Sequence, residues 1–261
     1  MPNLQAPDQD RTETHGIFDS AMSLGEHLIE LRKRLALAVV GAIICIVACL
    51  FFTGDILDYL IKPYNDAMKA AGLQSGLIIL APTEGFTTYL KIATWAGILL
   101  ASPWIFYQLW KFVSAGLYPK ERRYVYLAAP ACAILFITGA LFCVILVAPV
   151  TLQFLINFNK DFLAGSVSSF TFKEYLAFMV SMLVAFGISF QTPVIMFFLN
   201  KIGMLPVPLI NKSRRYVLFF IIVAASVITP GSDLISLFAL SGALYLLFEL
   251  GFVSILIAGR K

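Results

Sequence analysis

Long apolar stretches alternate with shorter polar segments along the chain, and this alternation predicts membrane-spanning helices. A helix needs about 20 mostly apolar residues to cross a hydrocarbon core about 30 Å thick. The candidate spans lie at about 35–52, 85–112, 124–148, 172–200, 216–228 and 234–259. The fifth reaches only about 20 Å at about 1.5 Å per residue, so it is the weakest of them. Six spans place both termini on one side of the membrane, whereas five would place them on opposite sides.

The segments between the spans predict the remaining organisation. Residues 1–22 are polar, which is typical of a disordered tail, and residues 23–261 are expected to form a single transmembrane domain. The loops Thr53–Glu84 and Pro149–Thr171 carry apolar and aromatic residues that favour amphipathic interfacial helices. Pro63 is expected to break the first of these helices.

Prolines inside three of the spans predict a curved wall. Pro193 removes a helical hydrogen bond and clashes with the carbonyl of Ser189, and Pro103 and Pro130 act similarly in the second and third spans. Helices bent in this way do not pack as a flat bundle. We therefore expect an all-α polytopic membrane protein with six transmembrane helices in a curved, cupped arrangement.

The composition agrees with a membrane protein and gives its orientation. Hydrophobic residues make up 60% of the chain and charged residues 13%, against about 45–50% and about 25% in a soluble domain. These values exclude a soluble enzyme, a disordered chain and a free nucleic-acid-binding domain. With a cytoplasmic N-terminus, the basic residues that fall outside are only Lys62, Lys69, Lys91, Lys160 and Lys173, of 19 in total. The positive-inside rule therefore predicts that both termini are cytoplasmic.

Catalytic and metal-binding chemistry is not indicated. Neither His15 nor His27 lies in a span, and the chain lacks GxSxG, HExxH and P-loop motifs. Its four cysteines lie in apolar runs, without metal-ligand spacing or a predicted disulfide. We therefore expect neither an enzyme nor a bound cofactor or metal.

Two polar residues lie deep in the predicted spans, and each has two interpretations. Glu249 is either a functional carboxylate or a hydrogen-bonded group that holds helices together. Gln191 is either a satisfied amide at the kink before Pro193 or an intramembrane polar contact in a groove open to lipid. The residues alone leave both pairs of alternatives open.

Two glutamates stand among the basic residues of the predicted cytoplasmic face. Glu30 precedes the first span, and Glu121 lies between the second and third spans. Both dilute the positive charge that orients the chain. A local ion pair, such as Glu30 with Arg34, is the simplest interpretation, and an exposed pair contributes only roughly 0–1 kcal/mol.

Four ordered motifs resemble those of the TatC family, the receptor core of the twin-arginine protein translocase. They are His27-Leu28-Ile29-Glu30-Leu31-Arg32-Lys33-Arg34, then Ser102-Pro103 to Gly116-Leu117-Tyr118-Pro119-Lys120-Glu121-Arg122-Arg123, then Phe186-Gly187-Ile188-Ser189-Phe190-Gln191-Thr192-Pro193, and finally Thr229-Pro230 followed by Tyr245 and Glu249. The resemblance covers about residues 23–258. It implies a protein that binds the signal peptides of folded precursor proteins and nucleates an export complex, driven by the proton-motive force.

The resemblance also implies roles for individual residues. Glu30 and Glu121 correspond to the carboxylates that receive the two arginines of the signal, and a guanidinium fork suits a carboxylate. Phe112 matches a position beside that site, and Arg32 and His27 lie in the N-terminal motif. The apolar part of the signal would lie along the concave face of the protein.

The chain departs from the family pattern at two positions. Gln191 stands where many members carry glutamate, so a mechanism that protonates this side chain is not available here. The last outside loop, Thr229–Asp233, holds one extra residue before its acid, which leaves the role of Asp233 open.

The resemblance implies partners and a location as well. The partners are twin-arginine signal peptides, TatA- and TatB-type single-span subunits, further copies of the chain and the lipid bilayer, in the bacterial cytoplasmic (inner) membrane. The short fifth and sixth helices are the expected docking edge for partner helices. The alternative function is a secondary transporter or channel for small solutes, a class that often shows repeats around a polar midplane. No repeat is evident between the two halves of this chain.

Overall fold

The computed structural model is all-α and describes residues 24–74, 76–116, 122–162, 170–228 and 234–258. In chain order these residues form α1 (Leu24–Ala70), α2 (Pro82–Ala115), α3 (Arg122–Phe142), the π-helical turn η1 (Cys143–Val147), α4 (Ala148–Phe162), α5 (Phe172–Ser189), α6 (Thr192–Lys201), α7 (Val207–Ile228) and α8 (Leu234–Ala258). An isolated β-bridge joins Ile78 to Thr171. The predicted helical fold is confirmed for this part of the chain.

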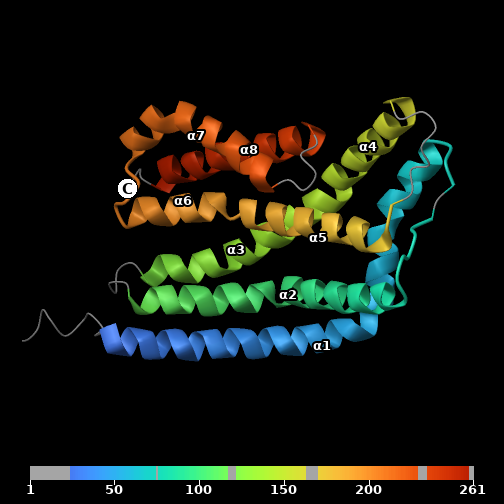
Figure 1. The fold of residues 1–261 in the computed structure, drawn as a ribbon. Helices are drawn as coiled ribbons and strands as arrows, with labels where there is room; N and C mark the ends of the chain where they lie inside the picture. Colours follow the sequence, from blue (N-terminus) through green and yellow to red (C-terminus); the bar gives the residue numbers. More distant parts are fainter. Residues whose placement is uncertain (1–23, 75, 117–121, 163–169, 229–233, 259–261) are drawn as a thin grey trace, which may run out of the picture.

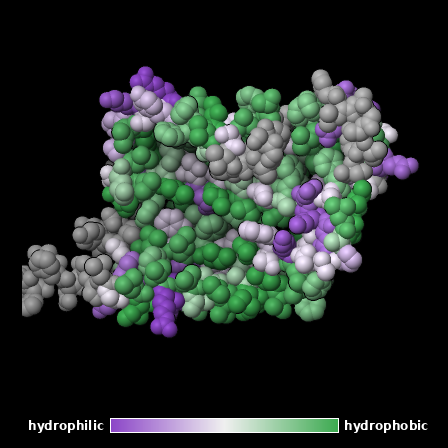
Figure 2. Space-filling view, in the orientation of Figure 1, coloured by the Kyte–Doolittle hydropathy of each residue, from purple (hydrophilic) through white to green (hydrophobic). Residues whose placement is uncertain are grey.

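The helices run between two ends of the molecule (Figure 1). The start of α1 and the end of α8 lie at the same end, which we call the terminal end. The opposite end, the cap end, is formed by the last part of α1 and by α4. Figure 2 shows apolar residues over the middle of one face and hydrophilic residues mainly toward the two ends. This distribution suits a protein whose middle lies in hydrocarbon.

Five of the described helical segments are long and apolar enough to cross a membrane: Gly25–Ala70, Pro82–Ala115, Val125–Asp161, Phe172–Lys201 and Leu237–Ile257. α7 does not meet these criteria, and its first half carries Lys212, Arg214 and Arg215. It contains the span that the sequence marks as the weakest, but α7 has 22 residues and α8 has 25, so the prediction that these two helices are short is wrong. Figure 1 shows α7 running away from the terminal end and α8 returning to it, which completes the six-helix arrangement.

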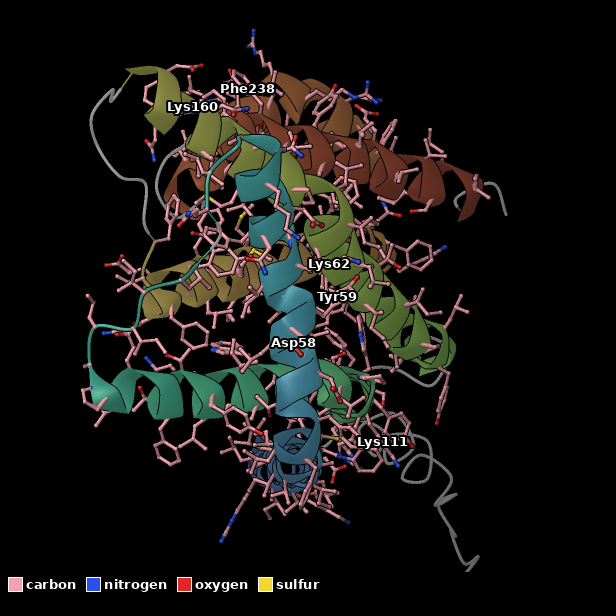
Figure 3. All side chains as sticks on the ribbon, turned by 90° about the vertical axis from the view of Figure 1, so that its right-hand side faces the viewer. Asp58, Tyr59, Lys62, Lys111, Lys160 and Phe238 are labelled. Carbon is pink, nitrogen blue, oxygen red and sulfur yellow. The ribbon has the colours of Figure 1, made fainter. Side chains whose placement is uncertain are left out.

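α1 is a single helix of 47 residues, far longer than the predicted first span. Pro63 lies inside it, so the prediction that this proline breaks the helix is wrong. The carbonyl that loses its helical partner belongs to Tyr59, which is exposed (Figure 3). The next turn is held from outside, because Tyr64 is fully buried and the Tyr175 hydroxyl donates to the carbonyl of Leu60 at 2.6 Å. Tertiary contacts therefore override the local effect of the proline.

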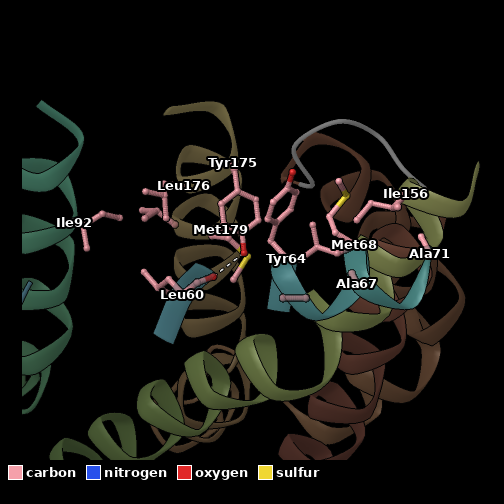
Figure 4. Close-up of a cluster of buried hydrophobic side chains, with 13 residues drawn as sticks. Leu60, Tyr64, Ala67, Met68, Ala71, Ile92, Ile156, Tyr175, Leu176 and Met179 are labelled. Carbon is pink, nitrogen blue, oxygen red and sulfur yellow. Dashed lines mark hydrogen bonds between the residues drawn. The ribbon is translucent and has the colours of Figure 1, made fainter. Parts of the chain in front are cut away.

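The cap end has its own hydrophobic core (Figure 4). It joins the last part of α1, the first half of α2, α4 and the first half of α5 through Leu60, Tyr64, Ala67, Met68, Ala71, Ile92, Ala148, Leu152, Ile156, Tyr175, Leu176, Met179 and Val180. The third span does not end near residue 148 as predicted, because α3 continues through η1 and α4 to Phe162. Lys160 ties α4 to the end of α1 by donating to the carbonyl of Ala71 at 2.8 Å. The two predicted loop helices thus pack against each other.

Glu84 joins the starts of α2 and α5 at the cap end. One of its carboxylate oxygens accepts hydrogen bonds from the backbone N–H groups of Leu80 and Ala81, at 2.9 and 3.3 Å. The other oxygen accepts a hydrogen bond from the backbone N–H of Lys173, at 3.0 Å. The first N–H groups of a helix have no partner within it, and a carboxylate satisfies them well. A single side chain therefore serves two helix starts.

Pro193 divides the fourth span into α5 and α6, as the sequence predicts. Pro193 has no N–H to donate to the carbonyl of Ser189. This carbonyl instead accepts a hydrogen bond from the Thr192 hydroxyl at 2.7 Å. Pro103 and Pro130 have a smaller effect, because α2 and α3 remain helical through them.

α1 and α2 approach each other closely through small residues. A Cβ atom at Gly97 would lie 2.6 Å from Cγ1 of Ile46 and 2.7 Å from its backbone nitrogen. Gly41 leaves the same kind of space for the ring of Trp104. Small residues at helix contacts are typical of membrane proteins, because they let two backbones approach. This contact sets the position of the end of α2 beside the start of α1.

Candidate recognition site at the terminal end

Glu30 forms an ion pair with Arg34, one turn later on α1. Its Oε1 accepts hydrogen bonds from Nε and Nη2 of Arg34, each at 2.6 Å. Arg34 also donates through Nη1 to Oε1 of Gln108 on α2, at 3.3 Å. The side chains of Arg34 and Glu30 are 15% and 21% exposed, and Gln108 is 2% exposed. The local ion pair that the sequence suggests is therefore present, and a buried amide of α2 orients it.

The ion pair uses one side of the carboxylate. Both nitrogens of Arg34 contact Oε1 of Glu30, whereas Oε2 has no hydrogen bond to any residue that the structure describes. An ionised carboxylate offers about four lone-pair positions, so it can serve two cationic partners. Glu30 therefore retains capacity for a second guanidinium from outside the protein.

An aromatic contact flanks the ion pair. The ring of His27 on α1 stacks on the ring of Phe112 on α2, with centroids 4.5 Å apart and an angle of 28° between the planes. A Cβ atom at Gly116 would lie 3.3 Å from Cε1 of His27, so glycine here leaves the histidine ring room against the end of α2. The structure therefore places His27 and Phe112 beside each other.

The structure places Arg32 outside this cluster and does not describe Glu121. Arg32 is exposed, and it lies two residues from Glu30 on a helix, so the two side chains do not share a face. Glu121 falls in 117–121, outside the described residues, so the second predicted carboxylate is not observed. α2 ends at Ala115, close in sequence to Glu121.

Gln108 belongs to the cluster although the sequence did not single it out as a site residue. It lies on the face of α2 that also carries Phe112 and Gly116, at successive intervals of four residues. A buried amide within an apolar helix needs partners inside the protein. This spacing, read together with the polarity, would have indicated the residue.

Gln191 lies in the interior of the protein at the break between α5 and α6. Its amide nitrogen donates to the carbonyl of Cys132 on α3 at 3.1 Å and to the carbonyl of Gly187 at 3.4 Å. The residue is 7% exposed, and Oε1 has no partner among the described residues. The hydrogen bonds of the amide nitrogen match the interpretation of a satisfied amide, whereas the amide oxygen remains available for a polar contact.

Glu249 on α8 pairs with Arg214 on α7, with Oε2 3.0 Å from Nη2. The guanidinium of Arg214 also lies over the ring of Phe252, 4.7 Å from its centroid. The carboxylate therefore holds α7 and α8 together, which matches the second of its two interpretations. Asp233 lies outside the described residues.

Comparisons with known proteins agree with the fold and the motifs. The family model described as Sec-independent protein translocase protein (TatC) matches residues 26–242. A TatC protein of Carboxydothermus hydrogenoformans is 34% identical over 240 residues, which cover 92% of this chain and 94% of that protein. A TatC protein of Campylobacter jejuni is 36% identical over 229 residues, covering 87% of this chain and 91% of that one.

A solved structure shows the same architecture. The crystal structure of a twin-arginine translocase receptor, TatC, superimposes with a TM-score of 0.75 at 29% sequence identity, covering 90% of this chain and 100% of that one. The helices described above, the motifs at their ends and the extent of these matches lead to one conclusion. The chain belongs to the TatC family of Sec-independent protein translocase proteins.

Proposed function

We propose that the chain is the receptor subunit that binds twin-arginine signal peptides and starts assembly of the export complex. The carboxylate of Glu30 carries the proposal, because Arg34 engages one oxygen and no described residue bonds to the other. A guanidinium of the signal can bond the second oxygen, or it can replace Arg34 at modest cost, since the pair is partly open to solvent. Gln108 would hold Arg34 in place during either event.

The remaining parts of the site suit the other features of such a signal. Glu121 would supply the second carboxylate, from a segment that directly follows α2. The stacked rings of His27 and Phe112 offer an aromatic surface for a planar cation, and Arg32 would contribute to the site from another side of α1. The apolar part of the signal would lie along the concave face, near Gln191.

The proposed orientation and energy source follow from the family and the charge pattern. The terminal end would face the cytoplasm, and the cap end would face the outside of the bacterial inner membrane. The export that this receptor starts would be driven by the proton-motive force. Labelling of single cysteines at position 26 and at position 58 with an impermeant reagent on intact cells tests the orientation. We expect labelling only at position 58, and labelling only at position 26 would reverse the assignment.

Partner subunits would dock along α7 and α8. Phe219 and Phe220 on α7 and Phe238 on α8 are large apolar side chains that are exposed on the surface of the chain. Single-span TatA- or TatB-type helices and further copies of the chain would cover such a surface. Disulfide mapping with cysteines at these positions is expected to give crosslinks to partner helices, and the absence of crosslinks along both helices would reject this docking edge.

The recognition site is tested by photocrosslinking of a labelled twin-arginine signal peptide to the purified protein. Glu30→Gln and Glu121→Gln are each expected to weaken crosslinking roughly tenfold, because each removes a hydrogen bond to a charged group in a partly solvated place. Glu174→Gln is the matched control, since Glu174 is exposed at the start of α5. Undiminished crosslinking in both site variants would refute the proposal.

A further inference from the structure

A continuous apolar groove runs between α2 and α5. It consists of a cavity of about 580 Å³ and an adjoining one of about 310 Å³. Both cavities are lined by Ile92, Trp95, Val180, Val184 and Ile188. We call this feature the α2–α5 groove. Its walls are mainly apolar along both helices, with single hydroxyls from Thr88, Ser102, Ser181 and Ser189, so a largely apolar chain suits it.

Two lysines lie at the cap end of the groove. Lys91 on α2 and Lys173 in the first turn of α5 are both exposed, and both line the larger cavity. Neither ammonium group has an ion pair or hydrogen bond among the described residues, and no acidic residue lines either cavity. Glu84 accepts the backbone N–H of Lys173, and its charge interacts with that of the lysine, but the two side chains form no ion pair in the described structure. The two lysines are therefore the charged groups that line the mouth of the groove.

The groove is longer than one leaflet of a bilayer is deep. Its lining residues on α2 run from Thr88 to Phe106. The part below the lysines, from Lys91 to Phe106, covers about 22 Å along the axis at about 1.5 Å per residue. An acyl chain that reaches half of a hydrocarbon core about 30 Å thick therefore fits within it. Trp95, which is partly exposed beside the lysines, is the type of residue found at the level of lipid headgroups.

We propose that the α2–α5 groove binds one anionic phospholipid, with its phosphate at Lys91 and Lys173 and an acyl chain along Ile92, Val180, Val184 and Ile188. The two ammonium groups need an anionic partner at the edge of the hydrocarbon, where an unpaired charge is costly. The apolar walls below them need a flexible apolar filler. A phospholipid supplies both in one molecule, because its phosphate is anionic and its acyl chain is apolar and flexible. None of the residues placed in the proposed arginine-binding site lines the groove.

The test measures lipid binding to the purified full-length chain in an uncharged detergent, without any signal peptide. Native mass spectrometry follows retention of added phosphatidylglycerol and phosphatidylcholine. We expect tighter retention of phosphatidylglycerol. The pair of changes Lys91→Gln and Lys173→Gln is expected to weaken its binding roughly fivefold for each lysine and to leave phosphatidylcholine unchanged. The control pair, Lys62→Gln and Lys69→Gln, removes two exposed lysines of α1 that lie outside the groove.

A second variant separates the apolar part of the site from the charged part. Val184→Phe places a larger side chain in the groove and is expected to reduce retention of both lipids. Ile222→Phe, at an exposed position of α7, is its control. Equal retention of the two lipids by the unchanged protein would overturn the proposal. So would undiminished phosphatidylglycerol binding in the Lys91 and Lys173 variant, an equal loss in the control pair, or displacement of the lipid by inorganic phosphate.

Discussion

Gly97 allows the closest approach between α1 and α2, so alanine at this position tests the packing directly. A Cβ atom there would lie 2.6 Å from Cγ1 of Ile46 and 2.7 Å from its backbone nitrogen. Carbon atoms in contact usually stay about 3.5–4.0 Å apart. The side chain of Ile46 can rotate, but its main chain is fixed in α1. The two helices must therefore move apart by about 1 Å.

The magnitude follows from two opposing effects. Overpacking of a well-filled contact costs about 1–3 kcal/mol, and a gap of about 0.5–1 Å forfeits a quarter to a half of each neighbouring dispersion contact. Alanine is favoured over glycine in a helix interior by about 1 kcal/mol. Because the clash involves main-chain atoms, the cost of overpacking should lie near the upper end of about 1–3 kcal/mol. We therefore expect Gly97→Ala to lower the free energy of unfolding by about 1–2 kcal/mol.

The assay is thermal unfolding of the purified protein in an uncharged detergent, followed by circular dichroism. The melting temperature is expected to fall by about 2–8 °C. Gly242→Ala is the matched control, because Gly242 lies in the interior of α8 and a Cβ atom there meets no atom within 4 Å. This control is expected to keep or raise the melting temperature. If Gly97→Ala were as stable as Gly242→Ala, the close contact between α1 and α2 would be refuted.

Three further substitutions probe other contacts. Tyr175→Phe removes a buried hydrogen bond of 2.6 Å to the main chain of α1 and is expected to lower the free energy of unfolding by about 1–2 kcal/mol. Amide hydrogen exchange at the cap end should become faster, and unchanged exchange there would contradict this role. Arg214→Gln leaves Glu249 without its ion-pair partner, so it should lower the melting temperature. Adding Glu249→Gln should recover part of this loss, and no recovery in the double-mutant cycle would contradict the pairing. Thr192→Val removes the donor to the carbonyl freed by Pro193 and should cost about 1 kcal/mol in thermal unfolding, and a neutral effect would count against that repair.

The apolar pattern was sufficient to predict the helices, because burial in lipid requires every spanning segment to satisfy its backbone internally. The break at Pro193 was also predictable from the sequence, because the proline ring removes a helical N–H donor and clashes with the carbonyl of Ser189. The same rule failed at Pro63, where buried Tyr64 and the hydrogen bond to Leu60 hold the helix together. Those partners come from α4 and α5, and a local pattern cannot show them.

The recognition site was predicted in part for a similar reason. The spacing of Glu30 and Arg34 on one helix predicts their ion pair directly. The link from Arg34 to Gln108 joins residues 74 positions apart, and the stack of His27 on Phe112 likewise joins α1 to α2. Such pairs depend on how closely two helices approach, which glycines such as Gly97 decide. The resemblance to a family identified the functional residues, and the packing explains how they are held.

The hydrogen bond between Tyr175 and Leu60 has a consequence for biosynthesis. Its two residues are separated by 115 positions. A ribosome that adds about 5–20 residues each second takes roughly 6–23 s to travel from one to the other. During that interval the last turns of α1 have been made, but the helices that cover them have not. The nascent chain must therefore hold its first hairpin in the membrane with an unfinished outer end, and the fold closes there only after the start of α5 has emerged.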